Sequence, residues 1–126
     1  MAKSVKKGAL ADLRRYTRRH GKPQSIELLV ADLAGVLRGK RIRPRDFDKT
    51  FEKGFNLPGG TVVLETSGDV VPGIPYTADD GDPDIDARVV AGSLVPIPWA
   101  KKPMAQALFR YYTRDGKAFL AEPRHV

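Results

Sequence analysis

The chain has 126 residues, a formal net charge of +7, two histidines and no cysteine. This length suits one domain with a single hydrophobic core. Without cysteine there is no disulfide framework and no thiolate metal site, and two histidines cannot form a histidine-rich metal cluster. No apolar run approaches the roughly 18 residues of a membrane span, and the N-terminus lacks the apolar core of a signal peptide. We therefore expect a cytoplasmic protein with no membrane partner.

The excess of positive charge lies in the first half of the chain. Residues 1–53 hold 15 Lys or Arg against 6 Asp or Glu, whereas residues 54–126 hold 7 against 9. A basic protein can bind nucleic acid, but here no aromatic platform interleaves with the basic residues. We therefore do not expect specific binding of DNA or RNA.

The first predicted element is a helix over Ser4–Arg19. Leu10, Leu13 and Thr17 recur at helical spacing among Lys and Arg residues, and Gly21 followed by a proline ends the pattern. We interpret the helix, within residues 1–24, as a solvated basic face, with an anion-binding arm as the alternative.

A β-hairpin is predicted next. Residues 25–32 are rich in Ile, Leu and Val, residues 34–35 form a tight turn, and residues 36–42 resume an extended segment. The second strand carries Arg38, Lys40 and Arg41, which predicts an edge strand or one that flanks an anionic partner.

The second predicted helix covers Pro44–Gly54. Its proline lies near the first turn, Phe47 and Phe51 share a face that should anchor it to a sheet, and Gly54 is a natural terminator. A turn at residues 57–60 then leads into a predicted strand at 61–65.

An acidic region follows over residues 69–86, with five aspartates between Asp79 and Asp86. So many carboxylates cannot pack together without cations or water, so the region should lie on the surface or face a charged partner. A calcium loop is rejected because Ile85 stands where a glycine is needed and Ala91 where a bidentate glutamate is needed. A solvated acidic loop remains the alternative.

The remaining predicted elements are strands over residues 88–97, interrupted at Gly92, and over residues 106–113. Asp115-Gly116 then predicts a hairpin turn back through residues 117–122. This order predicts an α+β fold, a mixed sheet with helices packed on one face. No phosphate-binding glycine motif and no nucleophile–base pair is present, so the chain has no complete catalytic site of its own.

An ordered set of short motifs now becomes recognisable, each of them weak alone. The set resembles the N-terminal domain of the glutamine synthetase family, and most closely its γ-glutamylpolyamine-synthetase-like branch, over residues 26–124. The motifs are Asp32-Leu33-Ala34-Gly35, Arg38-Gly39-Lys40, Lys53-Gly54-Phe55-Asn56-Leu57-Pro58, Gly81-Asp82-Pro83-Asp84, Pro98-Trp99, Asp115-Gly116 and Glu122-Pro123-Arg124.

The resemblance implies a β-grasp domain over residues 25–126. Enzymes of the family are glutamate–ammonia or glutamate–amine ligases, which use ATP and Mg²⁺ or Mn²⁺ to form a γ-glutamyl amide. In them the nucleotide and metal bind a larger C-terminal catalytic domain, so no cofactor or metal is expected in this chain. The N-terminal domain completes the active site of an adjacent subunit in a ring-shaped homo-oligomer, and alone it would be inactive.

The resemblance also implies two site residues, Glu65 and Asp84, as binding groups for ammonium or another amine. Glu65 stands where the family usually has an aspartate, a departure that argues against ammonia as the substrate and is compatible with a different amine. Trp99 is expected to pack at a strand end. The alternative function is a free-standing binding or regulatory module that uses the basic hairpin to hold an anionic partner.

Overall fold

The structure is a computed structural model that describes residues 2–58, 61, 67–69, 84–113, 115–117, 119 and 123. Its elements in chain order are α1 (Ala2–His20), β1 (Ser25–Ala31), β2 (Leu37–Ile42), a 3₁₀ turn (Pro44–Asp46), α2 (Phe47–Lys53), β3 (Phe55–Pro58), β4 (Asp84–Val89), β5 (Val95–Pro96) and β6 (Met104–Tyr112).

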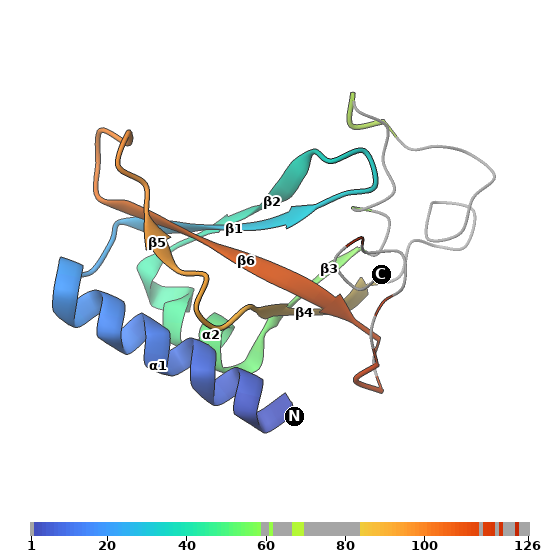
Figure 1. Ribbon diagram of the computed structural model, residues 1–126, viewed down its shortest axis with the longest axis horizontal. Helices are drawn as coiled ribbons and strands as arrows, with labels where there is room; N and C mark the ends of the chain where they lie inside the picture. The colour runs from blue at the N-terminus through green and yellow to red at the C-terminus, as the bar shows by residue number, and fades with distance from the viewer. Residues whose placement is uncertain are drawn as a thin grey trace.

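One mixed sheet organises these elements. Its strand order is β2-β1-β6-β4-β3, and the short β5 pairs with β6. The β1–β6 pair is parallel and the other pairs are antiparallel. Both helices lie on the same face of the sheet (Figure 1). The predicted α+β architecture, a mixed sheet with helices on one face, is therefore confirmed.

Helix α1 forms where its pattern predicts and ends at Gly21, whose φ of 82° suits a residue without a side chain. The Gly21 N–H donates to the carbonyl of Thr17 at 2.9 Å. The buried stripe consists of Ala9, Leu13 and Tyr16, whereas Thr17 is only half-buried. The helix thus joins the hydrophobic core, with its four arginines, Arg14, Arg15, Arg18 and Arg19, exposed.

The predicted hairpin is confirmed as β1 and β2, paired from Ile26 opposite Ile42 to Ala31 opposite Leu37. Alternate residues of β1 are buried, and Ile26, Leu28 and Val30 are fully enclosed in the core. The basic strand β2 lies at one edge of the sheet, as its charges predict.

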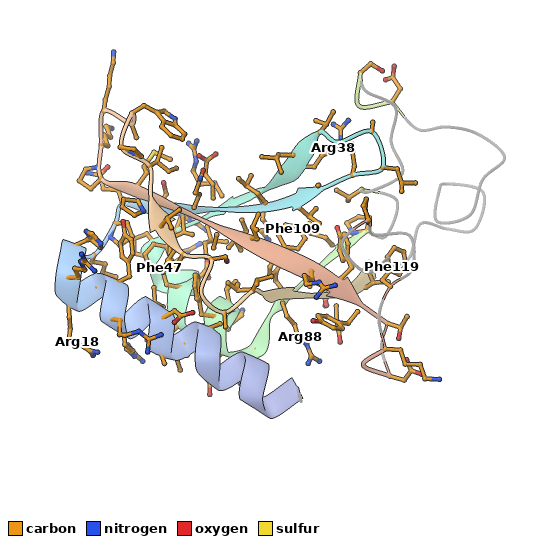
Figure 2. All side chains as sticks on the ribbon, in the orientation of Figure 1. Arg18, Arg38, Phe47, Arg88, Phe109 and Phe119 are labelled. Atoms are coloured by element: carbon orange, nitrogen blue, oxygen red, sulfur yellow. The ribbon has the colours of Figure 1, made fainter. Side chains whose placement is uncertain are left out.

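The second helix is confirmed as the 3₁₀ turn and α2, with Phe47 and Phe51 each only 2% exposed. Phe47 points from α2 into the space between the helices and the sheet (Figure 2). The predicted turn starting at Leu57 is wrong, because Leu57 and Pro58 belong to β3. A proline is tolerated there because β3 is an edge strand, where a missing N–H leaves no ladder bond unmade.

The strand after the acidic region begins at Asp84 and not at Arg88 as predicted. Ala87 and Val89 are buried and Ile85 packs against the core, so apolar residues alternate along this stretch. That alternation outweighs the low strand propensity of aspartate. The last aspartates of the run are therefore part of the sheet.

The hairpin turn at Asp115-Gly116 is confirmed, because the Thr113 N–H donates to the carbonyl of Lys117 at 2.8 Å and Gly116 has a φ of 84°. The packing role expected of Trp99 is wrong. Its side chain is 76% exposed, on the stretch between β5 and β6. Proximity to a strand end did not bury this ring, since the stretch projects from the sheet (Figure 1).

The predicted strand at 61–65 lies outside the described residues except for Thr61. Within the described part of the chain, no helix has both the length and the apolar character needed to cross a membrane.

A pair of glycines in the hairpin tests this packing. A Cβ at Gly39 would lie 1.6 Å from the carbonyl oxygen of Leu28, whereas a Cβ at Gly35 would meet no atom within 4 Å. We expect Gly39→Ala to lower the free energy of unfolding by about 3 kcal/mol, the upper end of overpacking costs. Gly35→Ala, whose φ is 81°, should cost only the left-handed strain of about 1 kcal/mol. Urea denaturation of both variants checks this, and equal losses would contradict it.

Candidate functional site

The strand directions bring several chain segments to one end of the sheet. Because β1 and β6 are parallel and β4 runs antiparallel to β6, the end of β1 and the start of β4 share that end. Strand β3 is antiparallel to β4, so Pro58 lies there too, opposite Asp84. The chain between these two residues contains Glu65. The candidate site is therefore this end of the sheet, at the tip of the β1–β2 hairpin.

A buried carboxylate organises the hairpin tip. Asp32 follows β1 directly and its side chain is fully buried. Its Oδ1 accepts the N–H of Val36 at 2.8 Å, and its Oδ2 accepts the Nε–H of Arg38 at 2.7 Å. Its backbone N–H donates to the carbonyl of Val36, and its own carbonyl accepts the N–H of Gly35. The Asp32 carboxylate is thus held by both the turn and β2.

Arg38 lies near the segment between β3 and β4. Its side chain is 18% exposed, and a Cβ built on Gly68 would lie 3.4 Å from an Arg38 guanidinium nitrogen. Next to Gly68, the hydroxyl of Ser67 donates to the Asp69 carboxylate at 3.0 Å. The Arg38 guanidinium thus lies near Gly68, which is three residues from Glu65 in sequence.

The other end of the segment is anchored at Pro58. The Pro58 carbonyl accepts the hydroxyl of Thr61 at 2.8 Å and that of Tyr111, which is fully buried, at 3.3 Å. The chain is thus tied to the folded sheet at Pro58, seven residues before Glu65 in sequence.

The two residues that sequence analysis assigned to the site are placed only in part. Asp84 is the first residue of β4 and pairs with Pro58, but its side chain lies outside the described residues, as does Glu65 as a whole. Their roles on an amine therefore stay predictions. Two strand positions further on, the Asp86 carboxylate lies 3.9 Å from the guanidinium of Arg88, which stacks over Tyr112 at 5.4 Å.

Sequence analysis did not single out Asp32 and Arg38 as partners. The available signal was an aspartate placed directly after an apolar strand and three residues before a turn glycine. That pattern is typical of a carboxylate that accepts hydrogen bonds from its own turn.

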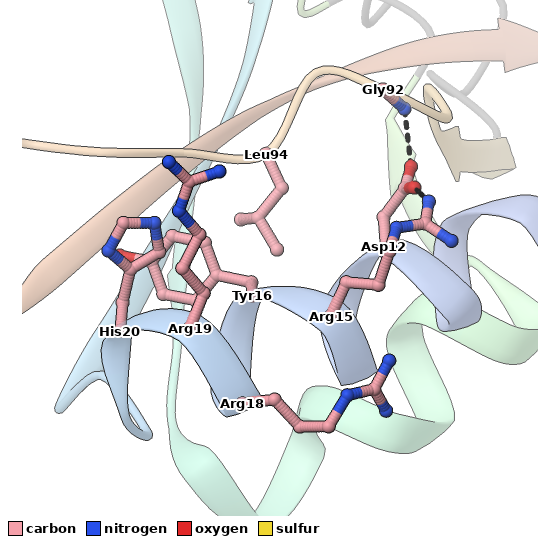
Figure 3. Close-up of a pocket in the computed structure, with 8 residues that line it drawn as sticks. All are labelled: Asp12, Arg15, Tyr16, Arg18, Arg19, His20, Gly92 and Leu94. Carbon is pink, nitrogen blue, oxygen red and sulfur yellow. Dashed lines mark hydrogen bonds and ion pairs between the residues drawn. The ribbon is translucent and has the colours of Figure 1, made fainter.

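A separate hollow of about 550 Å³ lies between α1 and the turn at Gly92. Figure 3 shows Asp12 between Arg15 and the backbone of Gly92, with Tyr16 and His20 further along the helix. The Asp12 carboxylate accepts hydrogen bonds from both neighbours, and burial raises the pKa of the Tyr16 phenol. Asp12 is the one carboxylate among the lining residues. Through the Asp12 carboxylate, α1 is thus held against the turn at Gly92. The described residues that line this hollow offer no pair of carboxylates for acid–base chemistry.

Among the described residues, no group of three or more His, Asp or Glu side chains is arranged to hold a metal ion. The described part of the chain therefore supplies a folded support for the candidate site, and its carboxylates are not grouped into a metal site.

Comparisons with known proteins found one curated relative and several solved structures that are similar to this chain. No family model matches the chain. It is 34% identical over 115 residues to gamma-glutamylputrescine synthetase PuuA of Escherichia coli (strain K12), a match covering 91% of this chain and 24% of that protein. The chain thus spans about a quarter of the length of this curated relative.

Solved structures share the fold. A novel glutamine synthase homolog superposes with a TM-score of 0.69 at 16% identity, over 82% of this chain and 25% of that one. A GmaS–ADP complex gives 0.65 at 25% identity, over 90% and 23%. Apo GmaS gives 0.66 at 24% identity, over 90% and 24%. The β-grasp fold implied by the sequence motifs is therefore confirmed.

The buried carboxylate gives a prediction for the site. Asp32→Asn leaves Arg38 without its buried counter-charge, and we expect the free energy of unfolding to fall by about 3 kcal/mol, as when one partner of a buried ion pair is removed. The control is Glu27→Gln in the same hairpin, because Glu27 pairs with the exposed Arg41 at 3.5 Å. That change should cost less than about 1 kcal/mol. Chemical denaturation gives both values, and an Asp32→Asn loss as small as that of the control would refute the role of Asp32.

Proposed function

Because the chain belongs to the glutamine synthetase family and corresponds to its N-terminal β-grasp domain, we propose that it serves as this domain in an ATP-dependent ligase. The ligase joins the γ-carboxyl group of glutamate to an amine as a γ-glutamyl amide. The observation that carries the proposal is the 34% identity to gamma-glutamylputrescine synthetase over 91% of this chain.

The activity requires a second domain in this proposal. The chain matches only about a quarter of that relative, and its sequence contains no phosphate-binding glycine motif. ATP and Mg²⁺ or Mn²⁺ would therefore bind a catalytic domain of the glutamine synthetase type. The β-grasp domain formed by this chain would complete the active site of an adjacent subunit in a ring-shaped assembly in the cytoplasm. By itself it would have no ligase activity.

The contribution of this domain would be to the amine. A protonated amine is attracted by carboxylates, whereas the carboxylate of glutamate and the phosphates of ATP are repelled by them. Glu65 and Asp84 are the proposed binding groups, and either could take the proton that the amine must lose before it attacks. The hydrogen bonds to the Pro58 carbonyl support this role, because they hold the end of β3 from which the chain leads to Glu65. The amine we favour is a diamine such as putrescine, by analogy with the relative.

The test uses the ligase that contains these residues, assembled with its catalytic domain. We expect Asp84→Asn to raise the KM for the amine about tenfold, equivalent to about 1.4 kcal/mol of lost attraction, and to leave the KM for ATP within about twofold. Steady-state kinetics with putrescine, ammonium, glutamate and ATP varied in turn measure this effect.

The matched control is Asp48→Asn, which removes an exposed carboxylate of α2 that pairs with Arg14 at 3.3 Å. This change should alter neither KM. A defect of Asp84→Asn confined to ATP would show that the acidic residue serves a different substrate. ATP-dependent γ-glutamyl transfer by residues 1–126 alone would refute the need for a second domain.

A further inference from the structure

A basic groove lies between the two edges of the sheet. Strands β2 and β3 are the outermost strands on opposite sides of the strand order, yet Lys40 of β2 places its ammonium nitrogen 5.5 Å from the centre of the Phe55 ring of β3. The sheet is therefore curled, and its edges border a groove of about 540 Å³ that also includes residues of α2 and of the turn before it. We call this the edge groove.

The edge groove carries an excess of positive charge. Five basic and two acidic side chains line it, which leaves a net excess of three positive charges; they are Lys40, Arg41, Arg43, Lys49, Lys53, Asp46 and Asp86. The basic groups come from β2, from the connection after it and from α2, so they converge on the groove from separate elements.

Few of these cations are neutralised. The Arg41 guanidinium lies 3.5 Å from Glu27, and the Asp86 carboxylate faces Arg88 outside the groove. Within the part of the chain that the structure describes, Arg43, Lys49 and Lys53 form no ion pair. Like charges gathered in one concavity repel each other, and this repulsion is relieved when an anion binds among them.

We propose that the edge groove binds a small anion with two linked phosphate groups. Such a diphosphate carries roughly three negative charges near neutral pH, which matches the excess in the groove. The volume lies within the range of small-molecule sites. Guanidinium and ammonium groups form strong, charge-assisted hydrogen bonds to phosphate, and edge strands offer backbone N–H groups as further donors.

The hollow beside α1 is a weaker candidate for the same chemistry. Its basic residues, Arg15, Arg18 and Arg19, all come from one helix, and the Arg15 guanidinium is already paired with Asp12. Of these two sites, the edge groove is the one whose described lining gathers cations from several elements around one space.

Isothermal titration of the 126-residue chain with sodium pyrophosphate, at about 50 mM salt so that screening stays modest, tests the proposal. We expect binding in the submillimolar range. The double variant Arg43→Gln/Lys49→Gln should weaken it at least tenfold, because two charge-assisted contacts are lost. The control Lys101→Gln/Lys102→Gln removes the same net charge from exposed lysines outside the groove and should keep the affinity within about twofold.

Three results would overturn the proposal. The first is the absence of pyrophosphate binding at about 10 mM ligand, a concentration at which even weak phosphate sites fill. The second is an equal loss in both double variants, which would indicate a general charge effect. The third is a lack of selectivity for pyrophosphate. It would be seen either as inorganic phosphate binding as tightly as pyrophosphate, or as a DNA duplex binding more tightly than pyrophosphate at about 200 mM salt, where contacts to phosphates alone are weak. No ligase assay enters this test, so its outcome is independent of the proposed function.

Discussion

The ion pair between Asp32 and Arg38 is the constraint on which the geometry of the candidate site depends. The carboxylate has no contact with solvent, and a buried charge without partners would cost several kcal/mol. The turn must therefore adopt the shape in which Val36 and Arg38 both reach Asp32. The guanidinium of the same arginine lies near Gly68, in the connection between β3 and β4. One buried charge thus determines the hairpin turn and the position of Arg38 beside that connection.

The mixed sheet assigns different tasks to its different parts. The helix-covered face holds the apolar core, in which Phe109 of β6 contacts Phe55 and Tyr111 edge to face. The end of the sheet at the hairpin tip gathers the segments proposed to meet the amine. The curl of the sheet brings β2 and β3 close enough to form the edge groove. The two proposed activities therefore lie on different parts of one scaffold.

The sequence predicted those elements whose signals are local. Helical spacing, terminating glycines and the turn at residues 34–35 gave α1, the β1–β2 hairpin and α2, and the ordered motifs gave the family. The start of β4 was missed because aspartates masked the alternation of Ile85, Ala87 and Val89. The exposure of Trp99 and the edge groove depend on tertiary contacts. The edge groove in particular forms only because β2 and β3 meet after the whole sheet has curled. The roles of Glu65 and Asp84 rest on resemblance alone.

The position of β6 in the sheet has a consequence for how the protein folds. This strand pairs with β1 on one side and with β4 and β5 on the other, yet among the described strands it is the last in chain order. During synthesis the β1–β2 hairpin and the β3–β4 pair therefore exist before the strand that joins them, each with an open edge that could pair with another chain. The join needs contacts between residues distant in sequence, and such contacts form slowly. The nascent chain is thus most exposed to aggregation just before residue 104 leaves the ribosome.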